Sequence, residues 1–355
     1  MRARPLRFAR ELALAGLGFA LGSALVRAFV PAAEGGALDL KLAYLRVHVE
    51  EYDALFLGSS RVHEGVVPRV FDDELARAGL ACRSFNAGAG GLHPFEQDWA
   101  LQRVLALAPR RLRWIFLEIG PVAHTAAGAD PLDDPWLDTA RGAQWHTLRE
   151  TALVLAAVWR APLGPLRRLE LARKHLELFG ARSSGLARGP DALARVGRDH
   201  LALAERTFAS RRWSEGFKDL EAFPEVTDGR RELLADPAAL RARVARIPAE
   251  NRRAVRTAEL PLELFRAAER GARARGIELV WFTMPGIEGV PEALRLAEAG
   301  ELPTLLHFDD PERYPELFEP EQRYDEGHLD RSGAERLSRA LAQAFLMHVD
   351  TRAGG

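Results

Sequence analysis

Short apolar runs that alternate with amphipathic helical segments are the feature that most constrains this fold. Between residues 53 and 121 each apolar run is brief and ends at a turn signal, as buried strands do. Strands separated by helices predict an α/β domain with a parallel sheet. The expected strands lie within 53–60, 82–94 and 113–121, and the expected helices within 67–80 and 95–107.

The alternation stops near residue 125 and returns near residue 260. Helix-like stretches with irregular links fill 125–255, without a good strand candidate. A helix and the strand "IELVWFTMP" follow within 260–286, then a short strand at 305–310 and a closing helix at 332–349. We therefore predict a single α/β domain over 34–355, interrupted by a helical insertion at about 125–255.

Composition excludes several classes of function. The 355 residues carry 49 basic and 50 acidic side chains, so no basic field indicates nucleic-acid binding. The single cysteine, Cys82, rules out an internal disulfide framework and a cysteine-rich metal site. Neither a Gly-x-x-x-x-Gly-Lys loop nor a His-x-x-x-His pair occurs. We expect no cofactor, no metal and no nucleic-acid partner.

The N-terminal segment has the pattern of an export signal. Four arginines among the first ten residues precede the apolar run "LALAGLGFALGSALV" at 12–26. This run is shorter than the roughly 20 residues that cross a bilayer, but a snorkelling Arg27 would extend it to about Ala33. We predict that 1–33 is a membrane signal anchor or a signal peptide cleaved after Ala32 or Ala33. The remaining chain would then be extracytoplasmic.

Two short motifs carry candidate chemistry. Gly58-Ser59-Ser60 ends the first strand, and Asp325 stands three residues before His328, where the last helix begins. A histidine that acts as general base for a serine needs a carboxylate on its other ring nitrogen, and a short Asp-x-x-His loop can supply both groups. Each motif alone is also an ordinary turn. We expect Ser60 Oγ within about 3 Å of His328 Nε2 if the two motifs act together.

Taken in chain order, a serine turn, a glycine-rich turn and an Asp-x-x-His loop resemble the SGNH hydrolase superfamily, also called GDSL-like esterases. The resemblance covers about 50–121 and 260–349. It implies a three-layer α/β/α fold and a triad of Ser60, His328 and Asp325. Ser59 is the alternative nucleophile, but the third residue of a Gly-x-Ser turn is the one that faces a site.

The same resemblance implies how an oxyanion would be held. The turn "NAGAGG" offers Gly91, or alternatively Gly90, as a backbone donor beside the N–H of Ser60. The superfamily also places an asparagine after the third strand, where this chain has Val122. Losing one oxyanion donor can cost ~10²–10³ in rate.

The missing asparagine, the Gly-Ser-Ser form and the N-terminal segment look like one branch of the superfamily. That branch holds the membrane-anchored alginate O-acetylation proteins and the lipoteichoic-acid D-alanylation protein. It implies an O-acyl esterase or O-acyltransferase acting on envelope or exported carbohydrate, with possible partners in an envelope complex. Two alternatives stay open: an inactive scaffold that binds polysaccharide or envelope proteins, and a general carboxylesterase or lipase.

Four further side chains lie beside these motifs. Arg61 could bind a uronate carboxylate or a phosphate, or it could simply face solvent. His63 and His93 are expected at the surface or behind the site. Glu118 ends a buried strand, where a charge needs a partner, so we expect it to anchor the turn at Arg61.

Overall fold

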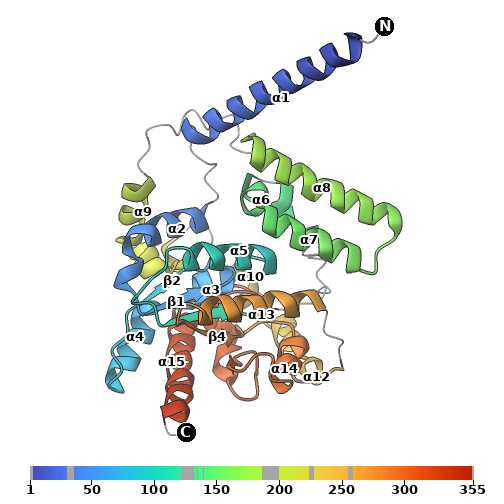
Figure 1. Cartoon of the computed structure of the whole chain (residues 1–355). Helices are drawn as coiled ribbons and strands as arrows, with labels where there is room; N and C mark the ends of the chain where they lie inside the picture. Colours follow the sequence, from blue (N-terminus) through green and yellow to red (C-terminus); the bar gives the residue numbers. More distant parts are fainter. Residues whose placement is uncertain are drawn as a thin grey trace. The chain divides into compact units, whose positions relative to one another are not determined.

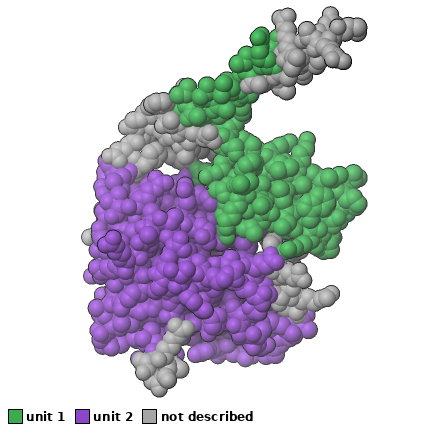
Figure 2. All heavy atoms as spheres, viewed as in Figure 1, with its two compact units in different colours: residues 1–36, 130–199 green, residues 37–129, 200–355 purple. Residues whose placement is uncertain are grey.

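The computed structural model divides the chain into two compact units. One comprises 1–36 and 130–199, and the other comprises 37–129 and 200–355 (Figure 2). The structure describes residues 3–29, 36–120, 132–133, 135–138, 140–185, 200–223, 228–254 and 259–353. The unit that comprises 37–129 and 200–355 contains the sheet and every candidate site residue within the described part of the chain.

The described residues form a five-stranded sheet in which all neighbouring strands run parallel, in the order β2-β1-β3-β4-β5 (Figure 1). Each strand lies inside a range predicted from the sequence, so the predicted α/β class with a parallel sheet is confirmed. The strands are β1 (Ala54–Leu57), β2 (Ser84–Asn86), β3 (Trp114–Glu118), β4 (Glu278–Phe282) and β5 (Leu305–Leu306).

Alternate residues of each strand face opposite sides of the sheet. On one side Phe56 and Phe116 pack against Phe71 of α4 (Pro68–Arg77), and Phe116 also packs against Phe345 of α15 (Arg331–Ala353). All four rings are fully buried and belong to one hydrophobic cluster. Burial of both faces explains why the strands read as unbroken apolar runs instead of alternating patterns.

The opposite side of the sheet is covered by α5 (Pro94–Leu105) and α13 (Glu259–Arg273), which contact each other. Trp281 of β4 packs edge-to-face against Phe265 of α13, with ring centroids 5.0 Å apart. Its indole N–H donates to Glu269 Oε1 at 2.7 Å, so the buried polar edge of the ring is satisfied. Helices therefore lie on both faces of the sheet.

The remaining helices of this unit frame the sheet. From 200 to 254, within the range predicted as an insertion, the helices group with the sheet unit: α9 contacts α2, and the 3₁₀ segment η5 contacts β2. The elements are α2 (Ala37–His48), α3 (Ser60–Gly65), α9 (His200–Phe208), η5 (Arg211–Gly216), α10 (Asp228–Ala235), α11 (Ala238–Val244), α12 (Ile247–Asn251) and α14 (Pro291–Glu298).

The other unit is helical. It holds α1 (Ala3–Phe29), α6 (Ala140–Trp145), α7 (Leu148–Arg160) and α8 (Pro165–Ser184). Two buried histidines join α8 to the end of α6, with His146 Nε2 2.8 Å from His175 Nδ1. Gly185 closes α8 with φ +82°, the left-handed conformation that glycine adopts without strain.

The predicted membrane anchor is wrong as a transmembrane helix. Although α1 is 27 residues long, no helix within the described residues is both long and apolar enough to cross a bilayer.

Replacement of Phe345 by alanine tests the packing of α15 on the sheet. Phe345 is fully buried against Phe116 and Trp114, so we expect the Phe345→Ala variant to lose about 3–5 kcal/mol of unfolding free energy. Met347→Ala is the matched control, because this side chain of the same helix is 56% exposed. Its effect should stay within about 0.5 kcal/mol. Urea unfolding followed by circular dichroism measures both, and equal losses would contradict the packing.

Candidate active site

The turn after β1 places Ser60 at the first position of α3. Ser59 is the N-cap of this helix, and its Oγ accepts a hydrogen bond from the backbone N–H of Arg61 at 3.3 Å. The Ser59 hydroxyl is therefore engaged by the backbone, as N-cap serines are. A side chain at Gly58 would lie 2.6 Å from Glu118 Oε2, so only glycine lets the turn approach β3 this closely.

His328 joins the serine turn to the Asp-x-x-His loop. Its Nε2 lies 2.8 Å from Ser60 Oγ, although the two residues are 268 positions apart in the chain. Its Nδ1 lies 2.9 Å from each carboxylate oxygen of Asp325. The expected approach of Ser60 to His328 is confirmed by this distance.

The loop itself is fixed by the aspartate. Asp325 Oδ1 also accepts hydrogen bonds from the backbone N–H groups of Gly327, at 2.7 Å, and His328, at 2.8 Å. Burial opposes ionisation of Asp325, but these bonds and the one from the His328 ring outweigh it, so the Asp325 pKa lies below its ordinary value. An ionised Asp325 favours the tautomer in which Nδ1 of His328 carries the proton and Nε2 faces Ser60 as acceptor.

Glu118 ties the serine turn to the end of β3. Its Oε2 accepts a hydrogen bond from the backbone N–H of Ser59 at 2.6 Å, and its Oε1 forms an ion pair with Arg61 Nη2 at 3.0 Å. Only 2% of the Glu118 side chain is exposed, so this charge requires such partners. The expectation that Glu118 anchors the turn at Arg61 is confirmed, and Arg61 is engaged in an ion pair instead of facing solvent freely.

Arg61 and Asp309 form the polar layer next to this anchor. A side chain at Gly120 or Gly286 would lie about 3 Å from the Arg61 guanidinium, so the guanidinium packs between these two glycines. Asp309 is fully buried, and its Oδ1 accepts a hydrogen bond from the backbone N–H of Gly286 at 2.9 Å. Burial raises the pKa of Asp309 to about 7, with partial compensation by that hydrogen bond and by Arg61.

The loop with the predicted oxyanion donors follows β2. The backbone N–H of Ala89 donates to the carbonyl of Gly58 at 2.9 Å, which ties this loop to the serine turn. Gly90 and Gly91 are partly exposed on the loop, and Gly91 has φ +65°, which glycine adopts readily. The role of either N–H as an oxyanion donor stays a prediction. Val122, at the place of the superfamily asparagine, lies outside the described residues.

A buried lysine that was not among the predicted site residues contacts both α3 and the loop after β2. Lys41 Nζ lies 2.7 Å from His63 Nδ1 and 2.5 Å from the carbonyl oxygen of Gly88. Burial lowers the pKa of Lys41 and that of His63 well below their ordinary values. The signal was present, because Lys41 stands among the apolar residues that α2 buries: Leu38, Leu42 and Leu45.

The two histidines beside the motifs are both buried. His63 is 3% exposed, and its ring packs at 5.0 Å against Trp213. His93 is 8% exposed and immediately precedes α5. Both side chains are therefore buried, which excludes the expected surface position for each of them.

Glu64 was not among the predicted site residues either. Its Oε2 lies 3.6 Å from His328 Nε2, and its Oε1 accepts a hydrogen bond from Lys218 Nζ at 2.9 Å. Glu64 follows Ser60 by one helical turn, so the two side chains share a face of α3. The sequence signal would have been an acidic residue at that spacing, but Lys218 is too distant in the chain to be paired with it beforehand.

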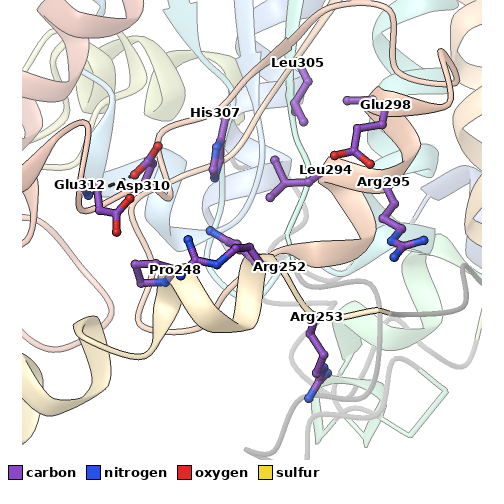
Figure 3. Close-up of a pocket in the computed structure, with 12 residues that line it drawn as sticks. Pro248, Arg252, Arg253, Leu294, Arg295, Glu298, Leu305, His307, Asp310 and Glu312 are labelled. Atoms are coloured by element: carbon purple, nitrogen blue, oxygen red, sulfur yellow. Dashed lines mark hydrogen bonds between the residues drawn. The ribbon is translucent and has the colours of Figure 1, made fainter.

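A cavity of about 540 Å³ lies beside the end of β5 (Figure 3). Its lining combines basic and acidic side chains: Arg252, Arg253, Arg295, Glu298, Asp310 and Glu312. Ser60, Asp325 and His328 are not among its lining residues. The cavity is therefore distinct from the triad.

Comparisons with known proteins add no assignment. A scan against models of protein families found no match to this chain, and a search of curated proteins found no match either. Within the described residues, no group of three or more His, Cys, Asp or Glu side chains is placed to hold a metal ion.

The raised pKa of Asp309 makes stability depend on pH. The folded state binds the proton of Asp309 more tightly than the unfolded state does. The contribution of this proton to the unfolding free energy is therefore complete below about pH 4 and is lost as pH rises through about 7. Asp309→Asn keeps an acceptor for Gly286 and removes the titration. Relative to Asp309→Asn, wild type should lose about 3–4 kcal/mol of unfolding free energy between pH 4 and pH 8.

Urea unfolding at several pH values measures this difference. The comparison between the two proteins cancels the titration of all other groups. Parallel stability curves over this pH range would show that Asp309 ionises normally in the folded state.

Proposed function

We propose that this chain is a serine-dependent acyl-ester enzyme, an O-acyl esterase or O-acyltransferase. Ser60 would be the nucleophile, His328 the general base and Asp325 the group that orients it. The observation that carries the proposal is the position of His328, with Nε2 2.8 Å from Ser60 Oγ and Nδ1 2.9 Å from Asp325. A serine hydroxyl is a weak nucleophile until an adjacent base accepts its proton, and this arrangement supplies that base.

The reaction would begin when Ser60 Oγ attacks the carbonyl carbon of the ester and its proton moves to His328 Nε2. Asp325 stabilises the resulting imidazolium, while backbone N–H groups of Ser60 and Gly91 would donate to the oxyanion. The bond to the leaving alkoxide then breaks, and His328 returns the proton to that oxygen. Water or a sugar hydroxyl next gives its proton to His328 as its oxygen attacks the acyl carbonyl carbon. The bond from Ser60 Oγ to the acyl group then breaks, and His328 returns the proton to Ser60 Oγ.

The sheet topology supports this location. From β1 the chain passes to β2 on one side and then to β3 on the other, so the strand order reverses between β1 and β3. In doubly wound sheets, ligands bind at the carboxyl ends of the strands beside such a reversal. Ser60 follows β1 directly and Glu118 ends β3, so the candidate triad lies at that position.

The substrate class in this proposal is acylated carbohydrate outside the cytoplasm. It rests on the resemblance to SGNH hydrolases, in particular the branch that modifies exported polymers. The arginines and apolar run within residues 2–26 support export, independently of any membrane span. An envelope complex would supply the acceptor in the transferase form of the reaction.

A serine comparison tests the proposal. The purified full chain should hydrolyse a short-chain aryl acetate and react with a fluorophosphonate probe at Ser60. Ser60→Ala should lower turnover by at least ~10³-fold and abolish labelling, because the nucleophile is gone. Ser59→Ala is the matched control: it removes a helix cap worth about 1 kcal/mol and should retain turnover within roughly tenfold.

Wild-type protein that neither hydrolyses acyl esters nor reacts with the probe at Ser60 would contradict the enzyme proposal and favour the inactive scaffold. Substrate class is tested by comparing acetylated oligosaccharides with simple esters of increasing acyl length. Preference for long acyl chains, with no turnover of acetylated sugar, would instead favour a lipase or general carboxylesterase.

A further inference from the structure

Glu64 places a second carboxylate beside the candidate triad. We infer that Glu64 is a positioning residue for His328: the Glu64 carboxylate stabilises the proton that the histidine receives from Ser60. This role rests on the function proposed for Ser60. It differs from the role of Asp325, because Glu64 faces the other nitrogen of the ring, Nε2.

The geometry around Nε2 gives the first argument. Ser60 Oγ lies 2.8 Å away and Glu64 Oε2 lies 3.6 Å away, so one neutral and one anionic oxygen flank the same nitrogen. At 3.6 Å the carboxylate does not replace Ser60 as hydrogen-bond partner in the resting site. It is close enough for a strong attraction once the nitrogen carries a proton and the ring a positive charge.

The environment of Glu64 gives the second argument. Only 8% of the residue is exposed, and a buried carboxylate needs a compensating partner. Lys218 provides it: Nζ contacts Glu64 Oε1 at 2.9 Å, while the Lys218 backbone N–H donates to the carbonyl of His63 at 2.9 Å. Lys218 is thus fixed to α3 at two points, and one carboxylate oxygen of Glu64 is left to face His328.

Other charged groups face this pair from the neighbouring elements. For Glu64 these are Lys218 and, from α2, Lys41. For His328 they are Asp325 and Glu64, which raise its pKa, and Arg61, which lowers it, with His63 nearby. Burial of His328 lowers its pKa, but the two carboxylates outweigh burial, so the pKa lies above the ordinary value.

The consequence for catalysis follows from the moment at which charge appears. In the resting site Nε2 of the neutral ring accepts the hydrogen bond from Ser60, so the attraction between the ring and the Glu64 carboxylate is weak. When the Ser60 proton moves to Nε2, the new imidazolium lies beside an anion that was already in place. The attraction between the Glu64 carboxylate and the ring therefore grows toward the transition state and lowers the barrier. The cost is that acid protonates the resting His328 more easily.

Two substitutions test the inference with shifts of opposite sign. Glu64→Gln should decrease the proton affinity of His328 by roughly tenfold, because it removes the anion and leaves Lys218 uncompensated. Lys218→Met should increase that affinity, since the charge of Glu64 then acts without its counter-ion. Titration of isotope-labelled histidine by NMR in the full chain measures both shifts. Glu301→Gln, which removes a surface carboxylate paired with Arg266, is the control and should change nothing.

The pH profile of kcat/KM supplies the catalytic readout. The acid limb should move to lower pH in Glu64→Gln, and the plateau of kcat should fall by roughly three- to tenfold, whereas a merely structural residue would lower the plateau alone. Equal His328 titration in wild type and both variants would overturn the inference. Opposite titration shifts without any turnover or Ser60 labelling would instead overturn the proposed function, and the catalytic role of Glu64 with it.

Discussion

The buried carboxylate of Glu118 is the interaction on which the candidate site depends. It receives the backbone N–H of Ser59 and the guanidinium of Arg61, so the end of β3 is bound to the turn that begins α3. Without these contacts, the Glu118 carboxylate would be a buried charge with no partner, and the backbone N–H of Ser59 would be a donor with no acceptor. The position of Ser60 is therefore a consequence of sheet packing as much as of its own helix. The glycine at position 58 is the steric condition for this contact.

Much of the fold could be predicted from the sequence because parallel strands buried on both faces leave a clear local record. The runs around Phe56, Phe116 and Val280 are short, apolar and bounded by turns, and each becomes a strand. At α1 the prediction was wrong: the N-terminal apolar run was expected to span a bilayer with Arg27 snorkelling, but no helix within the described residues is long and apolar enough to do so. The grouping of residues 200–254 with the sheet depends on contacts across the chain, such as those of α9 with α2, which no local pattern records.

The candidate site likewise contains some residues that the sequence predicts and others that it does not. Ser60, Asp325 and His328 could be found because a nucleophile, a base and a carboxylate impose residue types at characteristic places in chain order. Glu64 and Lys41 could not be assigned in this way, since their partners are a lysine 154 positions away and a histidine 22 positions away. Glu64 lies on a helix where a charged side chain is ordinary, whereas Lys41 stands among the buried leucines of α2, a pattern that indicates burial but not the partners of the lysine. The role of each residue depends on the groups that it contacts when buried, and only the folded chain establishes those contacts.

Lys41 also bears on where the working unit of this protein begins. It belongs to α2, which precedes the first strand, yet its ammonium group fills a space bounded by His63 Nδ1, the Gly88 carbonyl and the Asn86 side chain. A fragment cut at the start of β1 would retain the whole sheet and all three triad residues. It would nevertheless leave these three polar groups around an empty space beneath the loops. The candidate site thus requires a longer part of the chain than the segment that begins at β1, because it also requires α2.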